Sequence, residues 1–267
     1  RAARLLVHPN IVQILDVGVR DDGMPYLVLE FLFGESLGQL LRREERVAPA
    51  MAFAILRKAA AGLASAHAAG VVHRDVKPDN VFLVGEPGDP YSVKLLDFGL
   101  AKLDAQSGFT QAGTAVGTIE FMAPEQTLTE RPDARTDVYG LGVLMFRMFT
   151  GTLPFSAKDS ADLMARQLAL PAPLPSSLRP EIPDSLERVI LKTLRKRPEN
   201  RYASMADLLS DLEILAGHRE GELAAGAPAH EPDVYQPKTA FGKHACLFFH
   251  KKLGLEIPDL GSTEDAS

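Results

Sequence analysis

The eight residues from His73 to Asn80 read His-Arg-Asp-Val-Lys-Pro-Asp-Asn and form the most distinctive segment of the chain. A histidine, an arginine, an aspartate, a lysine and an asparagine stand at fixed places in this run. Five such matches would arise by chance in roughly one in ten thousand chains of this length. The run follows an alanine-rich stretch, residues 48–69, whose apolar spacing predicts a helix that ends at Gly70. The segment is therefore either a polar turn after a helix or a loop that carries chemistry.

Two shorter motifs follow along the chain. Residues 97–99 read Asp-Phe-Gly directly after a strand-like run, and residues 123–125 read Ala-Pro-Glu. Either tripeptide alone is a weak signal, but the order and separation of the three motifs make a strong one. Together they resemble the catalytic loop, the D-F-G motif and the A-P-E motif of eukaryotic-type protein kinases, over about residues 1–216. A lysine at position 77 resembles the serine/threonine branch of that family.

The resemblance implies a role for each polar residue of the loop. Phosphoryl transfer needs an in-line nucleophile and neutralised phosphate charge more than covalent help from the protein. Asp75 would orient the substrate hydroxyl and accept its proton, and Lys77 would lie beside the transferring phosphate. Asn80 and Asp97 would bind the magnesium ion that accompanies ATP, because a hard cation prefers oxygen ligands. Mn²⁺ is an alternative metal.

Five further residues match positions that support the kinase site. His73 and Phe98 are expected to have structural roles in the catalytic loop and the D-F-G motif. Glu125 would pair with Arg201, a contact that is structural rather than catalytic. Asp137 matches the buried aspartate that holds the catalytic loop from below. A helix N-cap is an alternative role for Asp137, and both roles are compatible.

The segment between the D-F-G and A-P-E motifs is polar and rich in small residues. Thr110 and Thr114 lie where relatives are autophosphorylated, and Arg74 would supply the cation that pairs with a phosphothreonine. Thr118 resembles the threonine that contacts the substrate's acceptor region and again favours serine and threonine substrates. A flexible polar loop without a regulatory role is the alternative interpretation.

The N-terminal part of the chain is expected to hold the adenine. Apolar runs at 11–19 and 26–33 flank a turn-like Arg-Asp-Asp-Gly and predict a β-hairpin. By resemblance, backbone groups of Glu30 and Leu32 would bind the adenine edge, and Leu29 would stand at the gate behind it. Phe82 would form part of the apolar adenine floor. An edge strand and a core phenylalanine are the plainer interpretations.

The resemblance also predicts what the chain lacks. We find neither a G-x-G-x-x-G loop nor a V-A-I-K strand in the 267 residues. These parts hold the ATP phosphates, so we expect weak ATP binding, feeble activity and an uncovered hairpin. The chain, which begins with Arg1, is interpreted as a fragment. The expected parts are an N-lobe remnant at 1–33 that includes the end of a helix at residues 1–7, a C-lobe at 34–216, and a flexible linker and tail at 217–267.

Composition limits the remaining function classes. Hydrophobic residues make up 46% and charged residues 24% of the chain, which is typical of a soluble globular protein. The net charge of -6 argues against nucleic-acid binding. A lone cysteine, Cys246, fits a reducing compartment, and no apolar run approaches the roughly 18 residues of a membrane span. We expect a cytoplasmic location, although a full-length protein with a membrane anchor is compatible with the sequence.

These observations favour an α+β, protein-kinase-like fold. Most of the chain would form the helical C-lobe, with a remnant of the N-lobe sheet. Its partners would be ATP and protein substrates with serine or threonine acceptors, and a kinase homodimer is a further option. Helices are also expected near 37–41, 137–150, 159–168, 185–196 and 204–216. The high alanine, arginine and leucine content favours a bacterial kinase. Two alternatives stay open: a pseudokinase-like binding module, and a small-molecule phosphotransferase of the aminoglycoside-kinase type.

Overall fold

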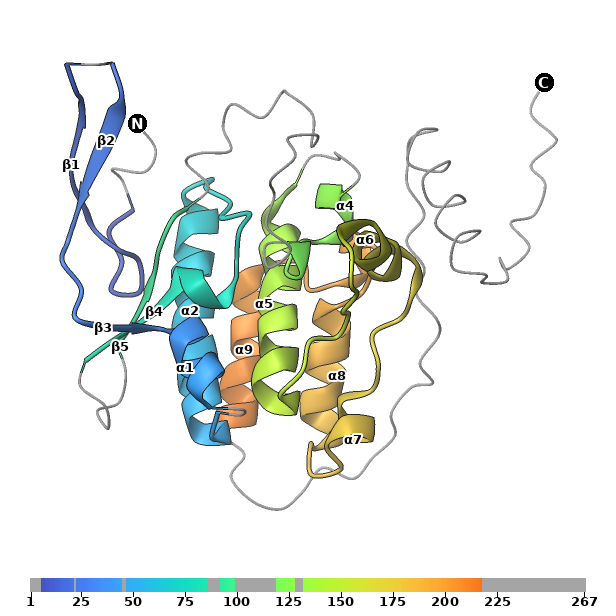
Figure 1. Cartoon of the computed structure of the whole chain (residues 1–267). Coiled ribbons are helices and arrows are strands. Elements are labelled where there is room, and N and C mark those ends of the chain that lie inside the picture. The colour runs from blue at the N-terminus through green and yellow to red at the C-terminus, as the bar shows by residue number, and fades with distance from the viewer. Residues whose placement is uncertain are drawn as a thin grey trace, which may run out of the picture.

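A group of long helices forms the centre of the molecule, as the computed structural model in Figure 1 shows. The structure describes residues 6–21, 23–44, 47–85, 92–98, 119–127 and 132–217. The central helices are α2 (Pro49–Ala68), α5 (Ala134–Thr150), α8 (Asp184–Thr193) and α9 (Met205–Gly217). Helix α2 packs against α5 and α9, and α5 packs against α8 and α9. Alanines of α2 such as Ala59 and Ala60 are fully buried, so small side chains allow these helices to approach closely.

Helix α5 is buried on nearly every side. Every residue from Val138 to Phe149 is buried except Arg147, which is half-buried. The helix begins three residues before the predicted start because the Asp133 side chain accepts a hydrogen bond from the Arg135 amide at 2.8 Å. It ends, as predicted, at Gly151, whose φ of 84° favours glycine.

A small antiparallel sheet links the helices to the catalytic loop. It contains β3 (Gly34–Ser36), β4 (Val81–Val84) and β5 (Ser92–Leu95), with Val81 opposite Leu95 in the register. Helix α1 (Leu37–Arg43) follows β3 directly, because Ser36 and Gln39 form a reciprocal capping box. The short helix η2 (Pro78–Asn80) directly precedes β4 in the chain. The sheet thus fixes the ends of the two segments that carry Asn80 and Asp97.

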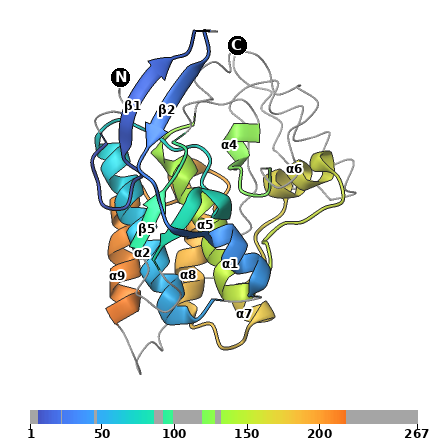
Figure 2. The same cartoon turned by 60° about the vertical axis from the view of Figure 1, so that its left-hand side comes forward.

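The predicted hairpin is present at the edge of the molecule. Strands β1 (Ile14–Val19) and β2 (Pro25–Leu29) pair antiparallel, and β2 ends four residues before the predicted limit. Backbone hydrogen bonds of 2.9 and 3.0 Å join Asn10 and Val12 to Leu95. In Figure 2 the hairpin projects beyond the helices. Its apolar side chains are exposed, as expected for an uncovered sheet: Leu15, Val17, Val19, Tyr26, Leu27, Val28 and Leu29.

No helix in the described part of the chain is long and apolar enough to cross a membrane. The helices not yet named complete the fold of that part. They are α4 (Pro124–Thr127), α6 (Ser160–Ala169), α7 (Pro175–Leu178) and η4 (Pro198–Asn200). Helix α6 occupies the place predicted for residues 159–168. The helix predicted to end near residue 7 does not include Leu6 or Val7, and residues 1–5 lie outside the described part, as does the tail after Gly217. The fold is α+β and mainly helical, as predicted.

Candidate active site

Asp137 of helix α5 holds the loop that carries the most distinctive motif. Its side chain is almost fully buried, with 1% of the residue exposed. Oδ2 accepts a hydrogen bond from the His73 amide at 2.8 Å, and Oδ1 accepts one from the Arg74 amide at 2.7 Å. His67 of α2 places Nε2 2.6 Å from Oδ2. One carboxylate therefore connects two core helices to the backbone of the loop.

The helix-cap alternative for Asp137 is wrong. Asp133 is the N-cap of α5, and its side chain accepts from the Arg135 amide. Asp137 lies one turn farther along the helix and directs its oxygens at another segment. The N-cap is the residue with non-helical backbone dihedrals just before the helix, which is Asp133, whereas Asp137 lies within the helix.

His73 is fully buried and its hydrogen bonds define its tautomer. Nε2 lies 2.8 Å from the Leu96 carbonyl, which can only accept, so Nε2 carries the proton. Nδ1 then accepts from the Asp75 amide at 3.3 Å. Burial lowers the pKa of His73 despite the nearby carboxylate of Asp137. A neutral imidazole thus connects the catalytic loop to the segment that leads into Asp97.

The carboxylate of Asp75 lies between two polar partners. Lys77 places Nζ 2.9 Å from Asp75 Oδ2, and Asn80 Nδ2 donates to the same oxygen at 3.0 Å. Asn80 also donates to the Asp75 carbonyl at 2.8 Å. Both charged side chains are about a fifth exposed, so solvent screens the ion pair only in part. The structure therefore brings together the three loop residues to which the sequence assigns the chemistry.

Asp97 lies next to this group because the backbone brings it there. The Leu96 amide donates to the Asn80 carbonyl at 2.9 Å, so Asp97 follows directly after a residue that is bonded to the loop. Its φ of 50° is in the left-handed region, and its side chain is exposed. The next residue, Phe98, is 5% exposed and packs its ring 4.6 Å from that of His73. Phe98 thus anchors the motif while Asp97 faces solvent.

Asn80 and Asp97 offer the type of donors that a magnesium ion prefers. The Asn80 amide nitrogen is used by Asp75, so its Oδ1 is the atom left for a cation. Within the described part of the chain, Asp97 has no ion-pair or hydrogen-bond partner, and no three histidine, cysteine or acidic side chains form a closed metal cluster. Two oxygen donors without a closed cage fit a Mg²⁺ ion that keeps waters and binds substrate phosphates.

Arg74 adopts a strained backbone conformation, with a φ of 65°. Its carbonyl accepts from Gln126 Nε2 at 2.9 Å, and Gln126 Oε1 in turn accepts from the Ala123 amide at 3.0 Å. The Nε atom of Arg74 is buried and has no hydrogen-bond partner among the residues that the structure describes. A buried cationic donor without a partner is a suitable contact for an added anion.

Glu125 and Arg201 form a buried, two-pronged ion pair. Arg201 Nη1 and Nη2 donate to the two oxygens of Glu125 at 2.7 and 2.8 Å, and Thr136 donates to Glu125 Oε1 at 2.9 Å. The guanidinium also donates to three backbone carbonyls, those of Arg135, Arg195 and Lys196. The two residues that the resemblance paired are thus in direct contact. The pair joins α4, α5 and the segment before α9.

Comparison with known proteins agrees with this geometry. The family model described as "Protein kinase domain" matches residues 1–211. The chain belongs to the protein kinase domain family. Serine/threonine-protein kinase Pkn1 of Myxococcus xanthus is 46% identical over 221 residues, which cover 82% of this kinase chain and 31% of the relative. Serine/threonine-protein kinase PknH of Mycobacterium tuberculosis is 36% identical over 253 residues, covering 90% and 40%.

Solved structures show the same fold. The PknI kinase domain of Mycobacterium tuberculosis matches with a TM-score of 0.61 at 27% identity, over 80% of this chain and 75% of that one. The kinase chain spans less than half the length of the curated relatives named above. The family uses ATP and a divalent metal, and the relatives named here are bacterial serine/threonine kinases, as the sequence predicted.

The segment of residues 30–33 that joins β2 to β3, here called the hinge, contains an ion pair that the sequence did not reveal. Lys94 of β5 places Nζ 2.6 Å from Glu30 Oε1, and the same oxygen accepts from the Gln13 amide at 2.8 Å. These interactions lower the pKa of Glu30, although partial burial opposes them. The pair ties the hinge to the strand that leads into Asp97. Position 94 alone gives no signal, because the partner is far away in the sequence.

The predicted adenine-binding residues lie around this hinge. The Glu30 amide donates to the Gln13 carbonyl at 3.0 Å, which leaves the Glu30 carbonyl for a ligand. Leu29 is 38% exposed at the end of β2, and Leu32 is half-buried. Phe82 is half-buried on β4, opposite Ser36 and Lys94 in the sheet register. The predicted residues Thr110, Thr114 and Thr118 lie outside the described residues.

Proposed function

We propose that this kinase domain transfers the γ-phosphoryl group of ATP to serine and threonine hydroxyls of proteins. The observation that carries the proposal is the cluster of Asp75, Lys77 and Asn80, with Asp97 joined to it through the Leu96–Asn80 hydrogen bond. The relatives named as serine/threonine-protein kinases support the choice of acceptor. Proteins of that class act on hydroxyl groups, and Lys77 fits the same class.

Each residue of the cluster has a distinct role in this proposal. Asp75 orients the acceptor hydroxyl and takes its proton, while Lys77, which lies 2.9 Å from Asp75, stabilises the charge of the transferring phosphoryl group. Asn80 Oδ1 and the Asp97 carboxylate hold the metal, for which we propose Mg²⁺ with Mn²⁺ as a substitute. The bound metal supplies neutralisation of the phosphate charge.

Arg74 supports a regulatory role for the threonines that follow Asp97 in the sequence. Its buried Nε lacks a partner within the described part of the chain, and a phosphate on Thr110 or Thr114 would supply three strong acceptor oxygens. We propose that autophosphorylation there orders the segment through Arg74. Thr118 is proposed to contact the acceptor residue of the substrate.

The test compares two aspartate-to-asparagine changes, one at the proposed metal site and one at an exposed position beside Asn80. Magnesium-dependent transfer from labelled ATP is measured for the chain, for Asp97→Asn, and for the matched control Asp79→Asn. Asp79 is exposed, and its carboxylate lies 3.4 Å from the exposed Arg42. We expect Asp97→Asn to reduce incorporation at least about 100-fold, and Asp79→Asn to change it by less than about twofold.

The same assay also tests the effect of the glycine-rich loop and the strand lysine that the 267 residues lack. The sequence has no G-x-G-x-x-G motif, so we expect a low rate that rises about 100- to 1000-fold when a kinase glycine-rich loop and strand lysine are fused before Arg1. Incorporation that survives Asp97→Asn would contradict the proposed metal site. No incorporation by either the chain or the fusion would favour a pseudokinase-like binding module instead.

A further inference from the structure

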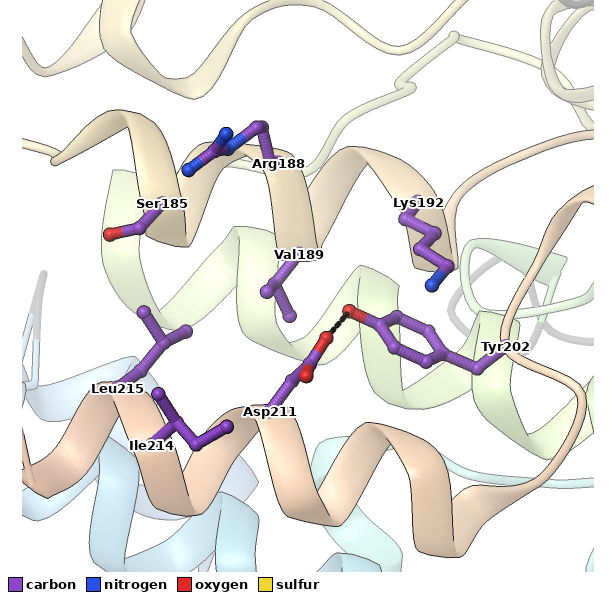
Figure 3. Close-up of a pocket in the computed structure, with 8 residues that line it drawn as sticks. All are labelled: Ser185, Arg188, Val189, Lys192, Tyr202, Asp211, Ile214 and Leu215. Carbon is purple, nitrogen blue, oxygen red and sulfur yellow. Dashed lines mark hydrogen bonds between the residues drawn. The ribbon is translucent and has the colours of Figure 1, made fainter. Parts of the chain in front are cut away.

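A pocket of about 300 Å³ lies between helices α8 and α9, built from elements that carry none of the proposed catalytic residues. Figure 3 shows its lining side chains. Four of them come from α8, three from α9, and one from the segment between the two helices: Ser185, Arg188, Val189, Lys192, Asp211, Ile214, Leu215 and Tyr202. The volume is at the lower end of those that bind small ligands or single side chains.

The apolar part of the pocket is accessible from solvent. Of its apolar lining residues, Val189 is buried and Leu215 is half-buried, while Ile214 leaves 54% of its surface exposed. Covering an exposed aliphatic side chain is favourable by about 25 cal/mol per Å² of apolar area. A partner that inserts one apolar side chain therefore gains from contact with all three residues.

The acid inside the pocket already has a partner. The Tyr202 hydroxyl donates to Asp211 Oδ2 at 2.6 Å, as the dashed line in Figure 3 marks. Burial and the Asp211 carboxylate both raise the pKa of Tyr202, so the phenol remains a neutral donor. Asp211 is thereby turned toward Tyr202, and the cationic side chains dominate the open rim.

Arg188 and Lys192 are four residues apart on α8, and both are exposed. Neither forms an ion pair or hydrogen bond within the part of the chain that the structure describes; Lys192 lies over the Tyr202 ring, 3.9 Å from its centre. Like charges at this spacing weaken a helix, so helix stability does not explain them. In Figure 3 they lie on either side of Val189. Two unpaired cations thus flank one apolar surface.

We propose that this pocket binds an acidic peptide segment of a partner protein. One aliphatic or aromatic side chain of the peptide enters between Val189 and Ile214. Carboxylates on either side of that residue pair with Arg188 and Lys192. A small monocarboxylate can neutralise only one of the two cations, whereas an extended peptide can reach both. The net charge of the whole chain is -6, so the attraction is local to this rim.

Titration calorimetry with a defined probe tests the proposal. The probe is the acetylated, amidated pentapeptide Glu-Asp-Phe-Asp-Glu, which has no phosphorylatable hydroxyl. Its controls are Gln-Asn-Phe-Asn-Gln, without charge, and Glu-Asp-Gly-Asp-Glu, without an apolar anchor. Phenylacetate serves as the small monocarboxylate with which the peptide is compared. The protein is used unchanged, as the Arg188→Gln/Lys192→Gln double variant, and as Lys158→Gln, a change at an exposed lysine outside the pocket.

We expect the double variant to weaken binding of the acidic peptide at least about tenfold, because two screened ion pairs are lost. Lys158→Gln should change the affinity by less than about twofold, and both control peptides should bind more weakly. Three results would overturn the proposal: no binding of the acidic peptide, binding that the double variant leaves intact, or phenylacetate binding as tightly as the peptide with the same sensitivity to the double variant. Unchanged circular dichroism shows that the variants fold.

Discussion

The Oδ1 atom of Asp137 accepts a hydrogen bond of 2.7 Å from the backbone amide of Arg74, whose φ is 65°. A non-glycine residue in this region of backbone space is strained by about 1–3 kcal/mol. The hydrogen bond offsets that strain, and a second one from the His73 amide fixes the preceding peptide. The conformation of the catalytic loop therefore depends on a carboxylate in the middle of the helical core.

Asp137→Asn is expected to destabilise the domain by about 2–4 kcal/mol. An asparagine keeps one acceptor oxygen, but its NH₂ group would face one of the two backbone amides, which leaves a buried donor unsatisfied. Urea unfolding measures the loss. The control is Asp133→Asn, which should lower stability by less than about 1 kcal/mol because asparagine caps helices as well as aspartate. Equal losses at the two positions would contradict the assignment.

Glu125→Gln is expected to lower the free energy of unfolding by about 3–5 kcal/mol, because it leaves the buried charge of Arg201 without a counterion. The partly exposed pair between Glu35 and Arg43 provides the matched control, since the Arg43 side chain is 57% exposed and the Glu35 side chain 24%. Glu35→Gln should lower stability by less than about 1 kcal/mol. Denaturant unfolding of both variants gives the comparison, and a small effect at Glu125 would refute a stabilising role for the pair.

Local sequence signals predicted the helices well but missed most of the contacts between them. The strong apolar pattern around α5 and the glycine at its end were sufficient to locate that helix. Asp133 was missed as its cap because Asp137 also resembles a cap in sequence. The contact between Glu125 and Arg201 was predicted only because the family motif carries it. Nothing local marks the bonds of Lys94 to Glu30 or of Gln126 to Arg74, because their partners are distant in the chain.

His73 is expected to make the stability depend on pH. Burial lowers its pKa in the folded state below the ordinary value of 6.5. Between pH 6.5 and that lower value the unfolded chain binds a proton that the folded chain does not, so the free energy of unfolding falls as the pH falls. Urea unfolding at pH 7.5 and 5.5 measures this loss, which should be smaller in His73→Gln, a variant without a titrating ring.

His8 provides a comparison for this prediction. Its pKa is also lowered, first by burial and then by the charge of Lys94, but it is half-buried whereas His73 is fully buried. His8→Gln should therefore reduce the loss of stability between pH 7.5 and 5.5 less than His73→Gln does. If His73→Gln keeps the whole pH dependence of the unchanged chain, other groups are responsible for it.

The segment between β2 and β3 is expected to limit solubility rather than stability. Phe31 is 91% exposed and Phe33 is 68% exposed, so both present apolar surface to solvent. Replacing both with serine should decrease self-association and the fluorescence of a hydrophobic dye. It should change the free energy of unfolding by less than about 0.5 kcal/mol, because little buried area is lost.

The control is Phe146→Ala in the core, which should reduce the free energy of unfolding by about 3–5 kcal/mol. Light scattering and urea unfolding distinguish the two effects, and a serine variant as unstable as Phe146→Ala would show that Phe31 and Phe33 are packed in solution.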